Sequence, residues 1–404
     1  MKNVKGVKDT SSTPSSPLSG VTVVSLEQAV AAPFATRQLA DLGARVIKVE
    51  RPDGGDFARA YDTTVKGLSS YFVWLNRSKE SVTLDLKQPE AAGILTQLID
   101  RADVFVQNLG PGAAARLGLS AEALRARQPA LIVCDVAGYG ASGPFADRKA
   151  YDLLVQAETG VMATTGTEET PSKVGISIAD ISAGMYAYSS ILAALFARTR
   201  TGAGATIDVS LFDSLGEWMS APAYYTMYGG TAPKRSGADH ASIAPYGPFG
   251  TKDGDSVLLG IQNAREWTRF CGEVLERPDL ADDERFRTNT LRVTNRAALT
   301  DAIDTVFQSL SAADVLSRLD RARIASARMN SVAGFVDHPQ LASRWREIAS
   351  PAGPLRVLAP AATIEGIDPV MGPIPALGEH TDSILRELGF DGGSIAGFRE
   401  KGLI

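Results

Sequence analysis

The chain has 404 residues, of which 44% are hydrophobic and 22% are charged, and its formal net charge is −5. A chain of this length is too long to fold around one ordinary hydrophobic core. The length therefore predicts two domains, or one large α/β domain with an insertion. Without a basic excess, we expect no nucleic-acid partner. The only cysteines, Cys134 and Cys271, lie far apart, which excludes a disulfide framework and agrees with a cytoplasmic location.

Residues 1–19 are polar and rich in Ser, Pro and Lys. They lack the apolar core of a signal peptide, so we predict a disordered tail. No stretch of the chain approaches the roughly 18 apolar residues that span a bilayer, so we expect no membrane partner.

Short β-rich runs alternate with helical patterns in the first half of the chain. This rhythm predicts an α/β domain, with a parallel sheet, helices on its faces and right-handed crossovers. The expected strands are 21–25, 45–50, 104–107 and 131–136, and the expected helices are 32–42, 89–101 and a short one after Pro111.

A long, largely buried helix is predicted at 181–198, a strand at 206–210 and a helix at 211–227, and the amino-acid composition changes after them. Residues 229–254 are rich in Gly, Pro and Ala, which indicates a linker or a long loop. A strand at 255–261 and several short charged helices follow. We therefore predict a large domain at 20–227, a smaller α+β domain at 228–328 and a C-terminal segment, 329–404, that returns to the large domain.

The segment Gly138–Gly143 matches the dinucleotide-binding pattern GxGxxG and follows a predicted strand. A true fingerprint opens a helix, because the pyrophosphate binds at the helix N-terminus. Here Pro144 and a charged stretch follow, which is a poor helical start. We interpret the glycines as a tight loop near a ligand and keep nicotinamide binding as an alternative.

The sequence contains no metal-binding signature, no P-loop and no GxSxG elbow. His240, His338 and His380 are widely spaced, and a structural or surface role is the ordinary interpretation of each. We expect no metal and no permanently bound cofactor.

Asp180 immediately precedes the long helix predicted at 181–198. The ordinary interpretation is an N-cap, because aspartate is among the best acceptors for the free amides of a helix start. A functional interpretation is compatible with this one, since an ionised carboxylate can attack an acyl group. Gly184, one turn further on, leaves room for a ligand near the backbone.

Several basic residues follow predicted strands, where ligands of open α/β sheets collect. Any one of them alone is usually a solvated charge, but together they can bind phosphate groups, and the arginine fork suits phosphate oxygens. The candidates are Arg51, Lys79, Lys87, Arg116 and Lys149.

Taken together, these segments resemble the family III CoA-transferases (the CaiB/BaiF family) over nearly the whole chain from about Leu18. Many short motifs follow the family's order and approximate spacing. They are Ala31–Pro33, Leu39–Ala44, Val46–Arg51, Asn76–Ser81, Leu84–Lys87, Asn108–Gly112 with Arg116, Gly138–Gly140, Tyr151–Asp152, Asp180 with Gly184, Thr201–Gly202 and Leu377–Asp382.

The resemblance implies that Asp180 is the nucleophilic aspartate and that coenzyme A or an acyl-CoA binds as substrate, together with a free carboxylic acid. It also implies a Rossmann-like large domain, a small domain, two linkers between them and an interlocked homodimer. The positions that match those holding CoA or lining the thioester site are Val30, Ala31, Arg51, Leu84, Lys87, Asn108, Leu109, Arg116, Lys149 and Tyr151.

Two departures narrow the activity that the resemblance implies. The consecutive glycines of formyl-CoA transferases are missing before the second domain, which argues against formyl or oxalyl specificity. Acyl-CoA racemases need a proton-transferring His and Glu where this chain has Tyr151 and Gln262. We expect transfer of CoA between carboxylic acids, with succinyl-CoA or another dicarboxylyl-CoA as a donor by analogy. Transfer between two carboxyls of one acid, an oxidoreductase and a noncatalytic CoA-binding protein remain alternatives.

Overall fold

The computed structural model describes residues 16–404, and the chain forms two compact units. Unit 1 combines the described part of Met1–Thr159 with Gly175–Met219 and Ser343–Ile404, whereas unit 2 combines Gly160–Val174 with Ser220–Ala342. The sequence predicted a second domain at 228–328, so unit 2 differs by starting earlier, ending later and including a segment before α8. Of the predicted tail, residues 1–15 lie outside the described residues, and 16–19 belong to a turn in which the Leu18 amide donates to the Leu42 carbonyl over 2.9 Å.

The sheet of unit 1 has six strands in the order β3-β2-β1-β4-β5-β6, all paired in parallel. This is the doubly wound order, and its connections reverse direction between β1 and β4. The strands are β1 Thr22–Leu26, β2 Arg45–Glu50, β3 Lys79–Thr83, β4 Val104–Gln107, β5 Ile132–Ala137 and β6 Thr206–Ser210.

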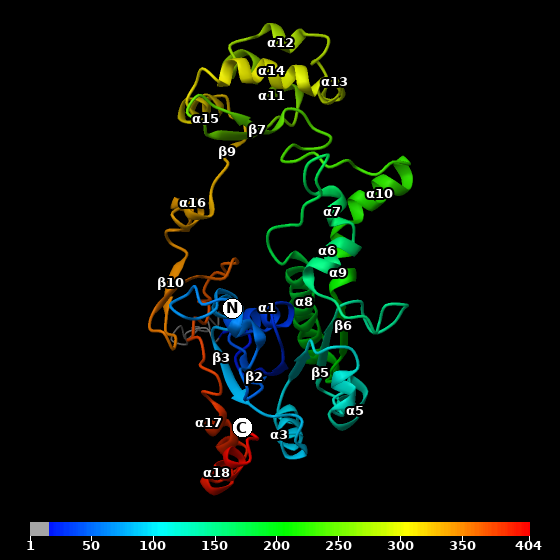
Figure 1. The fold of residues 1–404 in the computed structure, drawn as a ribbon, viewed down its shortest axis with the longest axis vertical. Helices are drawn as coiled ribbons and strands as arrows, with labels where there is room; N and C mark the ends of the chain where they lie inside the picture. The colour runs from blue at the N-terminus through cyan, green and yellow to red at the C-terminus, as the bar shows by residue number, and fades with distance from the viewer. Residues whose placement is uncertain (1–15) are drawn as a thin grey trace, which may run out of the picture. The chain divides into compact units, whose positions relative to one another are not determined.

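Helices cover both faces of this sheet (Figure 1). Leu95 of α3 (Pro89–Ile99), Leu124 of α5 (Ala121–Arg127), Ile384 of α17 (Thr381–Glu387) and Ile395 of α18 (Gly392–Glu400) share one apolar core with the sheet. On the other face α1 (Ala31–Asp41) packs against α8 (Ile178–Thr201), and α8 also contacts β5, β6 and α9 (Leu211–Trp218). Unit 1 also contains η1 Phe57–Ala60, α2 Ser70–Leu75, α4 Ala113–Arg116, α6 Asp152–Glu158 and the antiparallel pair β10 Trp345–Ile348 and β11 Leu355–Leu358.

Helix α8 is the one helix of residues 16–404 that is long and apolar enough to cross a membrane, by length and composition. In unit 1 it is a core helix, because Ala183, Ala187 and Ile191 are fully buried where it packs on the sheet. Its start differs from the prediction: Ser177 precedes the helix, and Asp180 is the third residue of the first turn. The prediction of Asp180 as an N-cap is therefore wrong.

Unit 2 has its own sheet of three antiparallel strands in the order β7-β8-β9. A separate apolar core forms beneath it, with Trp267, Phe270, Phe286 and Phe307 among its largest side chains. Its elements are α7 Val161–Thr164, α10 Ser220–Gly229, β7 Tyr246–Gly250, β8 Ser256–Gly260, α11 Ala264–Arg269, η2 Phe270–Val274, α12 Asp279–Asp282, α13 Asn289–Thr294, α14 Arg296–Phe307, α15 Ala312–Arg321, β9 Ser326–Arg328, α16 Val332–Val336 and η3 Pro339–Leu341.

Candidate functional site

A cavity of about 840 Å³ lies at the carboxyl ends of β1, β2, β3 and β4 in unit 1. Open α/β sheets bind ligands at these strand ends, next to the point where the strand order reverses. Because each loop after a strand reaches this edge, residues distant in sequence line one space. Five of the residues predicted to hold CoA line this cavity: Arg51, Leu84, Lys87, Leu109 and Arg116.

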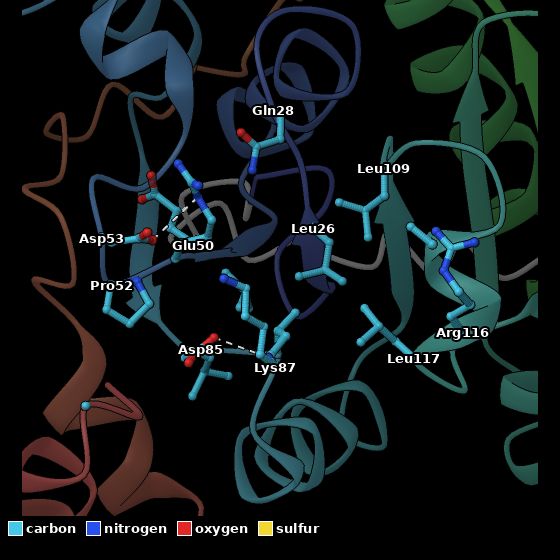
Figure 2. Close-up of a pocket in the computed structure, with 16 residues that line it drawn as sticks. Leu26, Gln28, Glu50, Pro52, Asp53, Asp85, Lys87, Leu109, Arg116 and Leu117 are labelled. Carbon is cyan, nitrogen blue, oxygen red and sulfur yellow. Dashed lines mark hydrogen bonds and ion pairs between the residues drawn. The ribbon is translucent and has the colours of Figure 1, made fainter. Parts of the chain in front are cut away.

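Three exposed cations in this cavity come from three separate strand ends. Figure 2 shows Lys87, from the segment after β3, and Arg116, from the segment after β4, on two sides of the space. Arg51, after β2, donates to the Gly55 carbonyl over 3.3 Å and lies 3.7 Å from Asp53. Leu26, Leu84 and Leu109 add apolar surface. Cations around an apolar floor fit a ligand that has both phosphates and an aromatic base.

The turn between β1 and α1 leads from this cavity toward Asp180. Gln28 lines the cavity, and two hydrogen bonds with Asn108 hold its backbone: the Gln28 amide donates to Oδ1 over 2.8 Å and Nδ2 donates to the Gln28 carbonyl over 2.9 Å. Ala29 has a φ of 59°, and Val30 and Ala31 then begin helix α1. Asn108, predicted to hold CoA, thus fixes the backbone of this turn.

Helices α1 and α8 approach each other closely beside the candidate nucleophile. A Cβ atom on Gly184 would lie 2.6 Å from the Ala31 carbonyl oxygen, so only glycine allows this contact. Asp180 precedes Gly184 by one helical turn and points from the same side of α8. The structure therefore brings the predicted residues Val30 and Ala31 next to the part of α8 that presents Asp180.

Asp152, the first residue of α6, occupies the free amides at the start of α8. Its Oδ1 accepts hydrogen bonds from Ala179 N over 2.8 Å and from Asp180 N over 3.4 Å, and its Oδ2 accepts from Gln156 Nε2 over 2.8 Å. Asp180 is partly buried and does not cap its own helix. Burial, together with the nearby Asp152 charge, raises the pKa of Asp180 to about 7.

The structure adds Tyr61 and its neighbour Tyr71, two residues that sequence reasoning missed. Burial, with the carboxylates of Asp56 and Asp180 and the neighbouring Tyr71 and Tyr151, raises the pKa of Tyr61 to about 12. Tyr61 packs edge-on against Tyr71, with ring centroids 5.5 Å apart. The predicted Tyr151 directly precedes Asp152 and is 66% exposed. Nothing in the local sequence distinguishes Tyr61 from an ordinary surface tyrosine, since Asp180 and Tyr151 come from distant segments of the chain.

Lys149 lines a different cavity of about 450 Å³, together with Tyr139, Arg148 and Glu158. It is the one predicted CoA residue of unit 1 placed in that second cavity. The glycine-rich segment 138–143 lies in the loop after β5, and the next helix, α6, starts only at Asp152. This arrangement lacks the helix start that a dinucleotide fingerprint needs.

No group of three or more His, Cys, Asp and Glu side chains within residues 16–404 has an arrangement that could hold a metal ion. The site thus consists of a cavity with three cations, a tightly held turn and a carboxylate of raised pKa. Residues 18–381 match the family model of CoA-transferase family III. The chain is a family III CoA-transferase.

Several relatives and solved structures of this family are similar along most of the CoA-transferase. The mouse (Mus musculus) succinyl-CoA:glutarate CoA-transferase is 36% identical over 94% of this chain and 88% of its own length. The succinate–glutarate CoA-transferase of Agrobacterium fabrum is 35% identical over 92% of this chain and 95% of its own. The crystal structure of a CaiB/BaiF family protein from Brucella suis has a TM-score of 0.83 and 34% identity, and covers 93% of this chain and 100% of that protein. The fold expected from the sequence, a Rossmann-like α/β domain of the CaiB/BaiF type, is confirmed.

Proposed function

We propose that this CoA-transferase moves CoA between two carboxylic acids with Asp180 as the covalent nucleophile. The observation that supports this most directly is the carboxylate of Asp180 on the first turn of α8, with a pKa raised to about 7. A carboxylate whose pKa is raised is a stronger nucleophile than an ordinary aspartate, and with a pKa of about 7 roughly half of it is ionised at neutral pH.

The reaction would proceed in two halves that mirror each other. An Oδ atom of Asp180 attacks the thioester carbonyl carbon, and the C–S bond breaks. CoA departs as a thiolate, and a mixed anhydride of Asp180 and the donor acid remains. The thiolate then attacks the aspartyl carbon, which releases the donor acid as a carboxylate and forms an aspartyl-CoA thioester. The acceptor carboxylate attacks the aspartyl carbon of this thioester and expels the thiolate, which gives a second mixed anhydride. The thiolate finally attacks the acceptor's acyl carbon, which forms the new acyl-CoA and releases the Asp180 carboxylate. Each step exchanges one acyl bond for another, so no net proton or water is consumed.

The residues around Asp180 have separate tasks in this proposal. Lys87, Arg51 and Arg116 bind phosphate groups in the cavity, and the chain of CoA follows the turn at Gln28–Ala31 toward Asp180. Tyr61 and Tyr151, near Asp180, adjoin the acyl group and limit access of water, which would hydrolyse an anhydride. The resemblance to the mouse and Agrobacterium enzymes makes succinyl-CoA and glutarate the first pair to test.

A panel of acyl-CoAs and free acids, analysed by mass spectrometry, tests the proposal. We expect CoA exchange with at least one dicarboxylate pair and hydroxylamine-sensitive labelling of the peptide that contains Asp180. If a labelled free acid appears as a new CoA ester, the enzyme transfers CoA between two molecules. If no such ester appears but CoA moves between the two carboxyl groups of one dicarboxylyl-CoA, the enzyme is an intramolecular transferase. CoA binding without either reaction would contradict the proposal. Sedimentation of the same sample tests the expected homodimer.

Replacing Lys87 or Arg116 by alanine is expected to raise KM for acyl-CoA by about 10- to 100-fold, because each substitution removes a charged hydrogen-bond donor to phosphate. We expect kcat to change much less, since neither residue reaches the thioester. Steady-state kinetics measures both constants. Arg399→Ala is the matched control: Arg399 is an exposed cation of unit 1 that is paired with Asp382 and does not line the cavity. Unchanged KM in both cavity variants would place the CoA phosphates elsewhere.

A further inference from the structure

Asp56 is a fully buried carboxylate that does not line the cavity and has no part in the proposed reaction steps. It lies in the loop between β2 and η1, and its side chain is 0% exposed. Its Oδ1 accepts from Ala29 N over 3.0 Å and from Ala58 N over 2.9 Å, while its Oδ2 accepts from Lys48 Nζ over 2.8 Å. One side chain thus joins the β1–α1 turn, the start of η1 and the second strand of the sheet.

Lys48, Asp56, Glu27 and Lys79 form a buried ionic cluster of two ammonium groups and two carboxylates. Glu27 accepts from Lys79 Nζ over 2.6 Å, and Lys48 Nζ lies 3.4 Å from Glu27 Oε1. The side chains of all four residues are 0% exposed. Buried charges are costly unless each is paired, so the charge balance of this cluster fixes the position of every member.

The cluster also anchors helix α1 on the sheet. Lys79 Nζ donates to the Pro33 carbonyl over 3.1 Å, and Thr36 Oγ1 donates to Glu27 Oε2 over 2.6 Å. Both Pro33 and Thr36 belong to α1. Lys79 and Glu27 therefore hold the beginning of α1, while Asp56 accepts from Ala29 N in the preceding turn, next to the Gln28 backbone that Asn108 holds.

The turn that Asp56 holds has an unfavourable backbone. Ala29 has a φ of 59°, a conformation that non-glycine residues adopt only when the surroundings impose it. The hydrogen bond from Ala29 N to Asp56 supplies this constraint. Val30 and Ala31 follow immediately, and the Ala31 carbonyl touches α8 at Gly184, one turn from Asp180. Asp56 also caps the start of η1, and Tyr61 follows this helix. The charges of Asp56 and Asp180 both contribute to the raised pKa of the Tyr61 hydroxyl.

We propose that Asp56 is a positioning residue for CoA transfer: it holds the Ala29–Ala31 turn and the η1 segment on two sides of Asp180, so that the thioester and the nucleophile meet. The inference rests on the proposed role of Asp180. Asp56 itself touches neither the cavity nor the reacting atoms. Displacements of about 1 Å at a reacting centre reduce rates by about 100-fold, so the loss of this anchor should affect kcat.

The test compares Asp56→Ala with Asp41→Ala, because alanine removes the acceptor of Ala29 N, whereas the amide oxygen of asparagine would keep it. Asp41 is the matched control, because it is also a buried carboxylate bound to cations at α1, pairing with Arg77 over 2.7 Å and with Arg37 over 2.8 Å at the other end of the helix. Both variants are expected to lower the unfolding temperature. Only Asp56→Ala should lower kcat, by about 10- to 100-fold, with KM for acyl-CoA changed no more than about threefold because the cations of the cavity are intact. Equal effects of the two variants on kcat would reduce Asp56 to a structural role and overturn the inference.

A second variant separates catalysis from folding. Asp56→Ala/Lys48→Met removes one cation and one anion, so that Glu27 and Lys79 still balance each other and no unpaired charge is buried. We expect this variant to regain much of the stability lost in Asp56→Ala, yet to keep the low kcat, because Ala29 N still lacks its acceptor. Recovery of kcat together with stability would contradict the proposal.

The labelling rate at Asp180 distinguishes failure of this inference from failure of the proposed function. In the Asp56 variants, trapping of acyl groups on Asp180 after rapid mixing with succinyl-CoA should slow in proportion to kcat. Wild-type labelling rates in these variants would refute the positioning role alone. Absence of label in the wild-type protein would refute the role of Asp180, whatever the Asp56 variants do.

Discussion

Replacing Asp180 by alanine is expected to reduce CoA transfer by about 10³-fold or more, because both covalent intermediates require its carboxylate. Binding of acyl-CoA should persist, since the cations of the cavity are unchanged. Exchange of labelled succinate into succinyl-CoA measures the first quantity, and a direct titration with acyl-CoA measures the second. An Asp180→Ala variant that transfers CoA near the wild-type rate would falsify the aspartyl mechanism.

Asp314→Ala is the matched control for this experiment. Asp314 is also an aspartate at the third position of a helix, α15, where it completes a capping box with Ser311. Its loss should lower the stability slightly and leave transfer unchanged. Asp180→Ala should do the reverse: the raised pKa means that ionised Asp180 destabilises the fold, so at pH 8 the variant should unfold at a higher temperature than the wild type. Inactivity together with instability would instead indicate misfolding.

The sheet was predictable where its strands are apolar and was missed where they are charged. Five of the six strands of unit 1 appear as apolar or alternating runs, such as the residues of β1 and β2. Strand β3 begins with Lys79 and Glu80, two charged residues of the kind that is usually exposed to solvent. Lys79 is buried there because Glu27 and the Pro33 carbonyl receive its ammonium group, and these partners lie 52 and 46 residues away. A single sequence does not reveal such a pairing.

Arg51 could be predicted to lie at the cavity because it directly follows an expected strand, and parallel strands end at the same edge of a sheet. For Lys87 and Arg116 the prediction depended on the resemblance to the family III CoA-transferases. The environment of Asp180 could not be predicted. Its helix starts three residues earlier than expected, and the free amides of Ala179 and Asp180 at that start bind Asp152, which lies 27 residues from Ala179 in the sequence. Asp56 was missed for the same reason, since a short polar loop residue has no local sign of complete burial.

The rate of acyl transfer to Asp180 is expected to depend on pH near neutrality. Burial and the charge of Asp152 raise the pKa of Asp180 to about 7. Below that pH Asp180 is protonated and cannot attack, so the rate constant for labelling should fall as pH drops from about 8 to 5, by roughly tenfold for each unit below the pKa. Single-turnover labelling with succinyl-CoA across this range measures the pKa in the free protein. An ordinary aspartate, with a pKa near 4, would show no change in this window.

Asp152→Asn separates the two causes of this shift. The amide oxygen of asparagine can still accept the hydrogen bond from Ala179 N, so the start of α8 remains capped, but the negative charge beside Asp180 is gone. The pKa of Asp180 should then fall, and the acid limb of the labelling profile should move to lower pH, while burial keeps it above the ordinary carboxyl value. Because a less basic carboxylate is also a weaker nucleophile, the plateau rate at pH 8 should decrease as the limb moves. A limb that stays in place would assign the whole shift to burial, and a limb that moves to higher pH would contradict the electrostatic role of Asp152.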